Sequence, residues 1–283
     1  MARWNVNRLV RAGARSASGR FALRVARDLR NLEFVDRGMT LAAHVFTSIL
    51  PILIVVGALR ATLEPGADAI FAEHLGFDDA TAEMLEKSLP TGAQELRVTG
   101  VVGVALLVIA ATSFARALER SLRTMWHTPN VSIKFAWRWL ATIVAVVIGV
   151  ALIVATRIIV RGGGALPVFE FIAEVAIWTA LWWIAAWIVI NGRVSLRQLL
   201  PGAVFAGVAF AIAGQVGRIV LPPMLAEAAL RFGVLGLAFS YIGWLLVLSC
   251  ILLIAMTAGR VVHLTRSGQA WRRSVSAPGT GTG

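Results

Sequence analysis

Six long apolar runs constrain the fold of this chain more than any other feature of its sequence. A membrane-spanning helix needs about 20 mainly apolar residues to cross roughly 30 Å of hydrocarbon, and six windows approach or exceed that length. They are Gly38–Leu59, Val98–Ala115, Trp139–Val160, Leu166–Ile190, Leu199–Leu221 and Val234–Ala258. The sequence therefore predicts an all-α, polytopic membrane protein with six transmembrane helices.

The composition excludes the other broad classes of protein. Hydrophobic residues make up 58% of the 283 residues and charged residues only 15%, whereas a soluble domain carries roughly 25% charged residues. The aliphatic residues occur in long runs, which excludes a disordered chain, a collagen and a coiled coil. Cys250 is the single cysteine, so no intramolecular disulfide and no cysteine-based metal site is expected.

The positive charges predict the orientation in the membrane. The chain has a net charge of +12, and about three-quarters of its 27 Lys and Arg residues precede the first span, follow the sixth, or separate spans two from three and four from five. Because positively charged loops remain in the cytoplasm, both termini are predicted to be cytoplasmic. The predicted topology accounts for where the positive charges lie, so we expect no nucleic-acid partner.

The predicted topology divides the chain into three regions. Residues 1–37 form a cytoplasmic basic segment without the apolar core of a signal peptide, and no cleavage is expected. Residues 38–260 form the membrane domain, which includes an acidic external loop at 61–97. Residues 261–283 form a cytoplasmic tail that is rich in Ser, Gly, Thr and Pro after Thr265, and we expect most of it to be disordered.

The basic segment contains an amphipathic pattern. Phe21, Val25, Leu29 and Leu32 recur at helical spacing, which predicts a helix with one apolar face. Arginines occupy complementary positions, namely Arg20, Arg24, Arg27 and Arg30. We predict an interfacial helix whose apolar face enters the acyl-chain boundary while its arginines bind anionic lipid headgroups. A solvated cytoplasmic helix is the alternative.

Three more arginines are predicted to contact headgroups at the cytoplasmic face. The second span continues as a helix beyond the bilayer and carries Arg116, Arg120 and Arg123 at spacings of four and three, which places them on one face. Tryptophans flank the next connection, and indole rings favour the membrane interface. Membrane lipids are therefore the predicted partners.

The first span contains a polar stripe that lines a cavity or serves only in packing. Pro51 lacks an N–H and crowds the carbonyl of Thr47, so the helix is expected to kink there. Ser48 lies one turn from His44 and is expected to help satisfy the freed carbonyl, as hydroxyls do in membrane helices.

A group of charged residues is predicted at the external ends of spans three to five. Glu170 and Glu174 lie four residues apart on one helical face. Charges near the hydrocarbon are costly and tend to pair, and Arg157 and Arg161 at the end of the third span are the expected partners. Gln215 and Arg218 in the fifth span are candidates to extend the cluster. The cluster is interpreted either as a structural ion-pair network or as a proton or substrate relay.

Small residues predict where two spans approach each other closely. Ala203, Gly207 and Ala211 repeat every four residues in the fifth span, as do Gly236 and Ser240 in the sixth. Faces of this kind let helix backbones come together in a membrane. We assign them to packing.

No pattern in the sequence predicts an enzyme. The four histidines are scattered, and the chain lacks the phosphate-binding loop G-x-x-x-x-G-K-[ST]. One acidic group in the external loop, Glu73, His74, Asp78 and Asp79, is better explained by a solvated helix than by a metal site. We predict no catalytic residues, no cofactor and no metal site.

Several motifs resemble the YihY/BrkB family of bacterial inner-membrane proteins. The first span carries Ser48-x-x-Pro51, and the second ends with Ala117-Leu118-x-x-x-Leu122-x-x-x-Trp126. A third match, Leu200-Pro201-Gly202, opens the fifth span. The sequence departs from the family at Ala258-Gly259-Arg260, where relatives commonly have Gly-Ala-Glu.

The resemblance implies a role in the bacterial inner membrane. Members of the family are described as envelope-integrity or export proteins, and an older label names some of them ribonuclease BN, a tRNA-processing enzyme. We therefore expect an envelope-integrity role, with transport or export of a lipid-like or amphipathic solute as the candidate activity. The alternative is a scaffold that recruits envelope proteins, whereas a nuclease is disfavoured because the acidic group is predicted outside the cell.

Overall fold

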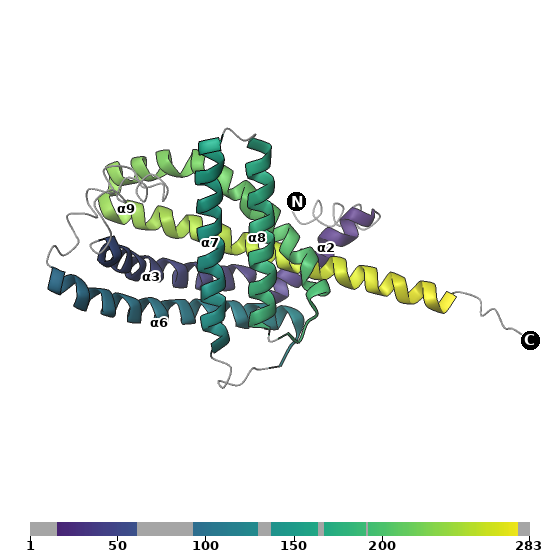
Figure 1. Ribbon diagram of the computed structural model, residues 1–283. Coiled ribbons are helices and arrows are strands. Elements are labelled where there is room, and N and C mark those ends of the chain that lie inside the picture. The colour runs from purple at the N-terminus through teal and green to yellow at the C-terminus, as the bar shows by residue number, and fades with distance from the viewer. Residues whose placement is uncertain (1–15, 61–92, 130–136, 164–166, 191, 277–283) are drawn as a thin grey trace, which may run out of the picture.

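The computed structural model describes residues 16–60, 93–129, 137–163, 167–190 and 192–276 (Figure 1). Every long element within these ranges is a helix. The helices are α2 (Ala17–Leu32), α3 (Phe34–Arg60), α6 (Ala93–Trp126), α7 (Trp137–Gly163), α8 (Pro167–Val189) and α9 (Leu196–Ser276). The predicted all-α class is confirmed, while the acidic residues of the loop at 61–97, except Glu95, lie outside the described residues.

Four stretches of the described helices are long and apolar enough to cross a membrane. They are Val101–Trp126, Trp137–Thr156, Val168–Val189 and Leu196–Arg266. The last stretch lies in α9, which consists of two helical halves joined at Gly233, whose φ of 60° and ψ of −142° are not helical. The protein is thus a multi-pass membrane protein, and the six predicted windows fall in α3, α6, α7, α8 and the two halves of α9.

The helices form two differently oriented groups. In Figure 1, α7 and α8 run up the view, while α3 and α6 run across it and α9 folds back on itself. The neighbouring pairs are α3 with α6, α3 with α9, α7 with α8, and α8 with α9. Helix α7 therefore joins the rest of the molecule through α8, which packs on α9, and through a smaller contact with α6.

Local sequence signals explain where the first helices begin and end. The Ser16 side chain accepts a hydrogen bond from the Gly19 amide at 2.9 Å and caps α2, as serine commonly does at a helix N-terminus. Glu33 adopts a left-handed conformation with φ of 53° and separates α2 from α3. His127, with φ of 50°, follows the end of α6. Glu33 therefore links α2 directly to α3.

Helix α2 packs against protein as well as presenting a polar face. The predicted helix is present, but Leu29 and Leu32 are buried in the molecule, where α2 contacts α9, α3 and α6. Asp28 pairs with Arg260 of α9 at 3.1 Å, and Arg24 donates to Thr265 at 3.4 Å. The second half of the apolar face that was predicted for the acyl-chain boundary is thus covered by the bundle.

The two halves of α9 cross at a contact between glycines. A Cβ added at Gly259 would collide with the backbone of Gly202 and Pro201, so only glycine permits this approach. Gly207 packs in the same way against Val175 and Thr179 of α8. The predicted small-residue face of the fifth window is therefore a helix-packing surface, as such faces are in membrane proteins.

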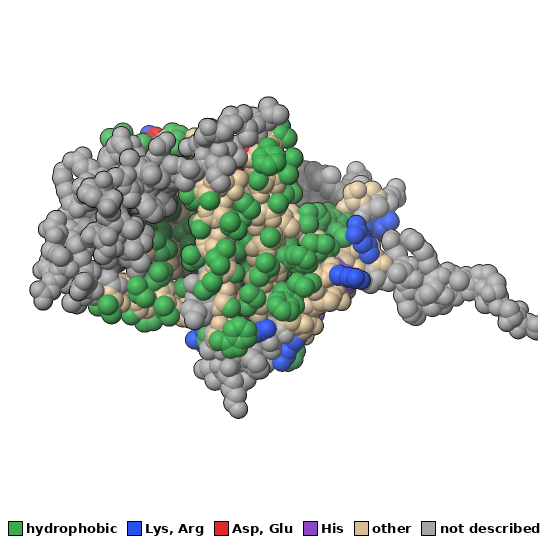
Figure 2. Space-filling view, viewed as in Figure 1, with side chains coloured by type: hydrophobic (Ala, Val, Ile, Leu, Met, Phe, Trp, Pro, Cys, Tyr) green, Lys and Arg blue, Asp and Glu red, His purple; other side chains and the backbone are tan. Residues whose placement is uncertain are grey.

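A buried core lies where several helix ends converge. Leu41 of α3, Leu118 and Leu122 of α6, and Leu253 of α9 are almost fully buried, and the C-terminal end of α8 joins them. Much of the remaining apolar surface is exposed, including Val101 of α6 at 72%. Figure 2 shows this broad hydrophobic surface over α7 and α8, with basic side chains gathered below it.

Helix α9 extends farther than the composition of the tail predicts. The chain was expected to lose regular structure after Thr265, yet α9 continues to Ser276. Arg, Gln and Ala within this stretch have good helix propensity, and arginines near a helix C-terminus interact favourably with the helix dipole. Residues 277–283 lie outside the described part of the chain.

Candidate functional site

The predicted charged cluster forms between α8 and α9. The Nη2 atom of Arg218 donates to Glu174 Oε1 at 2.8 Å and to Glu170 Oε1 at 3.1 Å. Its Nη1 atom donates to Gln215 Oε1 at 3.4 Å. One guanidinium group of α9 therefore binds two carboxylates of α8. Four of the eight residues predicted for a cavity or relay meet here.

The exposed fraction of the side chains in the cluster increases from the interior of the protein to its surface. The Glu174 side chain is fully buried, with 0% exposure, whereas Glu170 is 16% and Arg218 31% exposed. A buried carboxylate is stable only when it is paired and hydrogen-bonded. Arg218 supplies that pairing for Glu174 while remaining partly accessible.

Helix packing explains how Arg218 reaches the two glutamates. Glu170, Glu174, Trp178 and Trp182 recur every four residues on α8, which places them along one face. The rings of Trp178 and Trp182 lie 4.9 Å and 5.2 Å from Phe210 of α9. This aromatic layer and the Gly207 contact hold α8 and α9 together, and Arg218 follows Phe210 two turns later.

The arginine that pairs with the glutamates comes from α9. Candidate partners at 157 and 161 belong to α7, but the side chains of Arg157 and Arg161 lie outside the described part of the structure. Among the described side chains, Arg218, which was predicted only to extend the cluster, is the one that binds both glutamates. The reason is that α8 packs on α9 through small and aromatic residues.

The described hydrogen bond of the polar stripe in α3 is made within that helix. The Ser48 hydroxyl donates to the carbonyl of His44 at 2.8 Å, whereas it was expected to help the Thr47 carbonyl that Pro51 leaves without a donor. Ser48 and Pro51 are buried, and His44 is half-buried. None of the described hydrogen bonds of the Arg218 cluster comes from these three residues.

The arginines predicted to bind headgroups fall into two groups. Most of them are exposed, namely Arg20, Arg24, Arg27, Arg30, Arg116 and Arg120. Arg123 differs because its side chain is only 13% exposed and pairs with Glu119 at 3.3 Å. Glu119 is itself buried and also accepts a hydrogen bond from Trp139 Nε1 at 2.8 Å.

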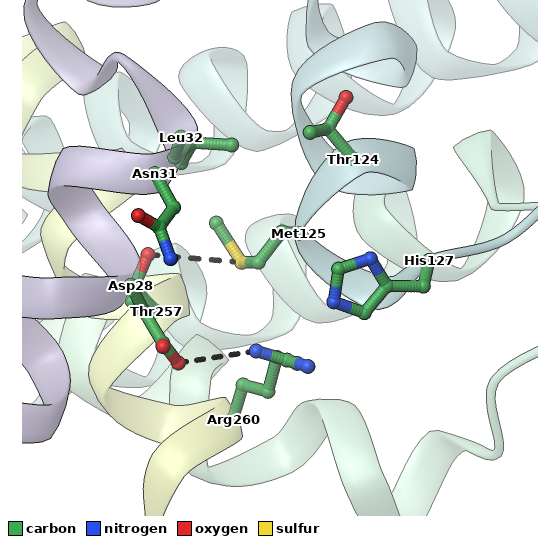
Figure 3. A pocket seen from close by; sticks show the side chains of 8 residues that line it. All are labelled: Asp28, Asn31, Leu32, Thr124, Met125, His127, Thr257 and Arg260. Carbon is green, nitrogen blue, oxygen red and sulfur yellow. Dashed lines mark hydrogen bonds and ion pairs between the residues drawn. The ribbon is translucent and has the colours of Figure 1, made fainter.

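A small pocket of about 80 Å³ lies where α2, α6 and α9 meet. Figure 3 shows the Asp28–Arg260 pair on one side of it and His127 on the other. The Thr257 hydroxyl at its wall donates to the carbonyl of Leu253 at 2.7 Å. The pocket is too small for an amphipathic solute, which leaves the Arg218 cluster as the stronger candidate.

The described residues contain no group of three or more His, Cys, Asp or Glu side chains that could hold a metal ion. The acidic group with His74 in the loop at 61–97 lies outside these residues. The prediction that the chain has no metal site and no cofactor therefore stays a prediction.

Sequence reasoning missed two charged contacts. Glu119 is the acidic residue among the arginines of α6, and its spacing of four from Arg123 is a recognisable helical pairing. That signal predicts the pair, but not the contact with Trp139. The Asp28–Arg260 pair joins residues separated by 232 positions, so no local pattern indicates it.

The fold and the cluster define the class: a multi-pass helical membrane protein with ion pairs between its helices. A family model described as "Virulence factor BrkB" matches residues 25–277. The chain belongs to this family, and the resemblance found in its motifs is confirmed. No curated protein and no solved structure matches it significantly.

Proposed function

We propose that this protein spans the bacterial inner membrane six times, with both termini in the cytoplasm. In this role it maintains the cell envelope by moving a lipid-like or amphipathic solute. The charge distribution supports the orientation, because the exposed arginines of α2 and of the C-terminal end of α6 lie in segments assigned to the cytoplasm. We propose no enzymatic activity and no nucleic-acid partner.

The observation that carries the proposal is the buried Glu174 carboxylate held by Arg218 between apolar helices. Ionisable groups in membrane helices are costly, and in general they mark substrate or ion pathways. Packing alone does not require them, since well-packed apolar residues can replace a buried ion pair without loss of stability.

The geometry of the cluster suggests how a polar head could enter it. Arg218 binds Glu174 in the interior and Glu170 nearer the surface. A solute head that offers an acceptor to Arg218 can replace Glu170 while Glu174 keeps the guanidinium in place. The apolar part of the solute would then lie against the aromatic layer of Trp178, Trp182 and Phe210.

Lipid flux measured in proteoliposomes tests the proposal. Reconstituted wild type and the variants Arg218→Gln and Glu170→Gln are compared for the rate at which a fluorescent phospholipid changes leaflet. We expect at least a tenfold slower rate in both variants, as is reasonable for the loss of charged hydrogen bonds. The control is Arg231→Gln, which alters an exposed i,i+4 pair with Glu227 on the same helix.

Lipid that co-purifies with the protein supplies a second readout. Native mass spectrometry of protein gently extracted in detergent should show a bound lipid that Arg218→Gln loses and that Glu170→Gln and Arg231→Gln retain. Equal flux and equal lipid retention in all variants would reject the proposal.

A scaffold that recruits envelope proteins is the second candidate, because Arg116 and Arg120 are exposed on one face of α6. A scaffold predicts that reversing these two charges disturbs the envelope while Glu170→Gln does not. Cells carrying each variant, tested for detergent sensitivity, separate the two functions.

A further inference from the structure

A cluster of arginines surrounds the junction between α6 and α7, far along the chain from the Arg218 cluster. Its members come from α6, from the start of α7 and from the turn before α9, namely Arg116, Arg123, Arg138 and Arg193. Within the described structure, the carboxylate of Glu119 lies among these arginines. The cluster therefore carries a local excess of positive charge.

The carboxylate of Glu119 is already engaged. Its Oε1 atom accepts from Arg123 at 3.3 Å, and its Oε2 atom accepts from Trp139 Nε1 at 2.8 Å. Arg138 lies within electrostatic range of both Glu119 and Arg193, but none of its described hydrogen bonds is to Glu119. The internal counter-charge is thus used by other donors.

Among the described residues, no acceptor faces one of the donors of Arg138. Its Nη1 atom is shielded from solvent and has no hydrogen-bond partner within the described structure. Leaving a charged donor in this state is costly. Arg193 is also positioned nearby, with its own Nη1 atom donating to the carbonyl of Pro129 at 3.3 Å.

Tryptophan rings hold two of the guanidinium groups. The guanidinium of Arg116 lies 5.3 Å from the ring centroid of Trp139, and that of Arg138 lies 5.7 Å from that of Trp137. Cation–π contacts of this kind orient the planar group. Trp137 is 63% exposed, as is typical of an indole at headgroup depth.

We infer that the arginine cluster binds a phosphate group, with Arg138 as its central ligand. Arginine presents paired donors that match the oxygens of phosphate, and basic pockets between membrane helices bind phosphate-bearing headgroups. The same chemistry suits a lipid phosphate or free inorganic phosphate. This inference does not depend on any movement of a solute through the protein.

Binding to lipid nanodiscs tests the inference. Full-length protein in nanodiscs of phosphatidylcholine is titrated with phosphatidic acid or phosphatidylglycerol, and the quenching of tryptophan fluorescence is followed with a brominated form of each lipid. We expect Arg138→Gln to weaken binding about tenfold. Arg138→Lys should weaken it as well, because lysine keeps the charge but loses the paired donors.

The control is Arg266→Gln, which removes the same charge from an exposed position on α9 and should change binding less than twofold. Added inorganic phosphate distinguishes the sources: competition at millimolar concentration indicates a site for free phosphate, and lack of competition indicates a headgroup site. Melting curves confirm that each variant is folded. If folded Arg138→Gln and Arg266→Gln bind alike, the cluster acts only through its general charge and the inference is wrong.

Discussion

The two ends of the α9 hairpin are built differently, although both are apolar. At one end the halves cross through Gly202 and Gly259, and Leu253 beside the crossing is fully buried. At the other end the halves meet at Gly233, around which Leu230 is 89% exposed and nothing lies within 4 Å of an added Cβ. Hydrophobicity alone therefore does not determine which part of a membrane helix contacts protein.

Burial and charged contacts make the difference between these ends, because small residues bring the halves close at both: a Cβ added at Gly236, near the corner, would also meet the backbone of Ala228. In a bilayer, lipid tails are as apolar as leucine, so association depends on close backbone approach and on polar contacts between helices. The crossing at Gly202 supplies the first, and the Arg218 cluster, between the crossing and the corner, supplies the second. The following variants test this comparison in order of decreasing expected effect.

The largest effect is expected from Arg218→Met, which leaves Glu170 and Glu174 without their shared partner. Breaking a buried pair costs about 3–5 kcal/mol. A large fall in melting temperature in detergent, followed by circular dichroism, would confirm it. Arg231→Met changes an exposed pair in the same half of α9 and serves as the control; equal destabilisation by both variants would contradict the assignment.

The next effect is expected from Gly259→Ala at the crossing. The added Cβ would meet the backbone of Gly202, which cannot move aside as a flexible side chain can, and overpacking costs about 1–3 kcal/mol. Gly243→Ala is the matched control, since nothing lies within 4 Å of its added Cβ. Denaturant titration should separate the two variants. Coincident unfolding curves would show that the crossing accommodates an added methyl group, against what the structure indicates.

A smaller effect is expected from Asp28→Asn, which weakens the contact of α2 with Arg260. The pair is partly exposed, so its contribution is about 1 kcal/mol or less. Hydrogen–deuterium exchange should become faster in α2 while α8 is unchanged. Asp36→Asn, an exposed change in the first turn of α3, should leave α2 as in the wild type. Unaltered exchange in Asp28→Asn would mean that Leu29 and Leu32 hold α2 without the ion pair.

The smallest effect is expected from Glu227→Gln near the Gly233 corner. Its partner is Arg231, and both side chains are about two-thirds exposed. Exposed pairs contribute roughly 0–1 kcal/mol and less in salt. Melting curves at low and high ionic strength should differ little from those of the wild type. A clear loss of stability would show that the corner depends on specific contacts, as the crossing does.

Periodicity and helix signals predict much of the fold. The apolar windows lie in the observed helices, and the spacing of Glu170 and Glu174 places them on one face of α8. The small residues around Gly207 were correctly assigned to packing. These features are local, because each depends on residues within a few turns of one helix.

The partners across helices could not be predicted from the sequence. Arg218 lies 44 positions from Glu174, and nothing in a single sequence shows that these two residues meet. The apolar face of α2 is a second case, since the same periodicity suits a lipid surface and a protein surface. Leu29 and Leu32 are covered because α9 continues past the membrane windows and meets α2 there.

The corner at Gly233 also constrains how the protein is made. The connection between the fifth and sixth predicted spans is short and helical except at Gly233, and it carries the exposed pair of Glu227 and Arg231. With so short a connection, the two halves of α9 are expected to insert into the bilayer together as a helical hairpin rather than one after the other.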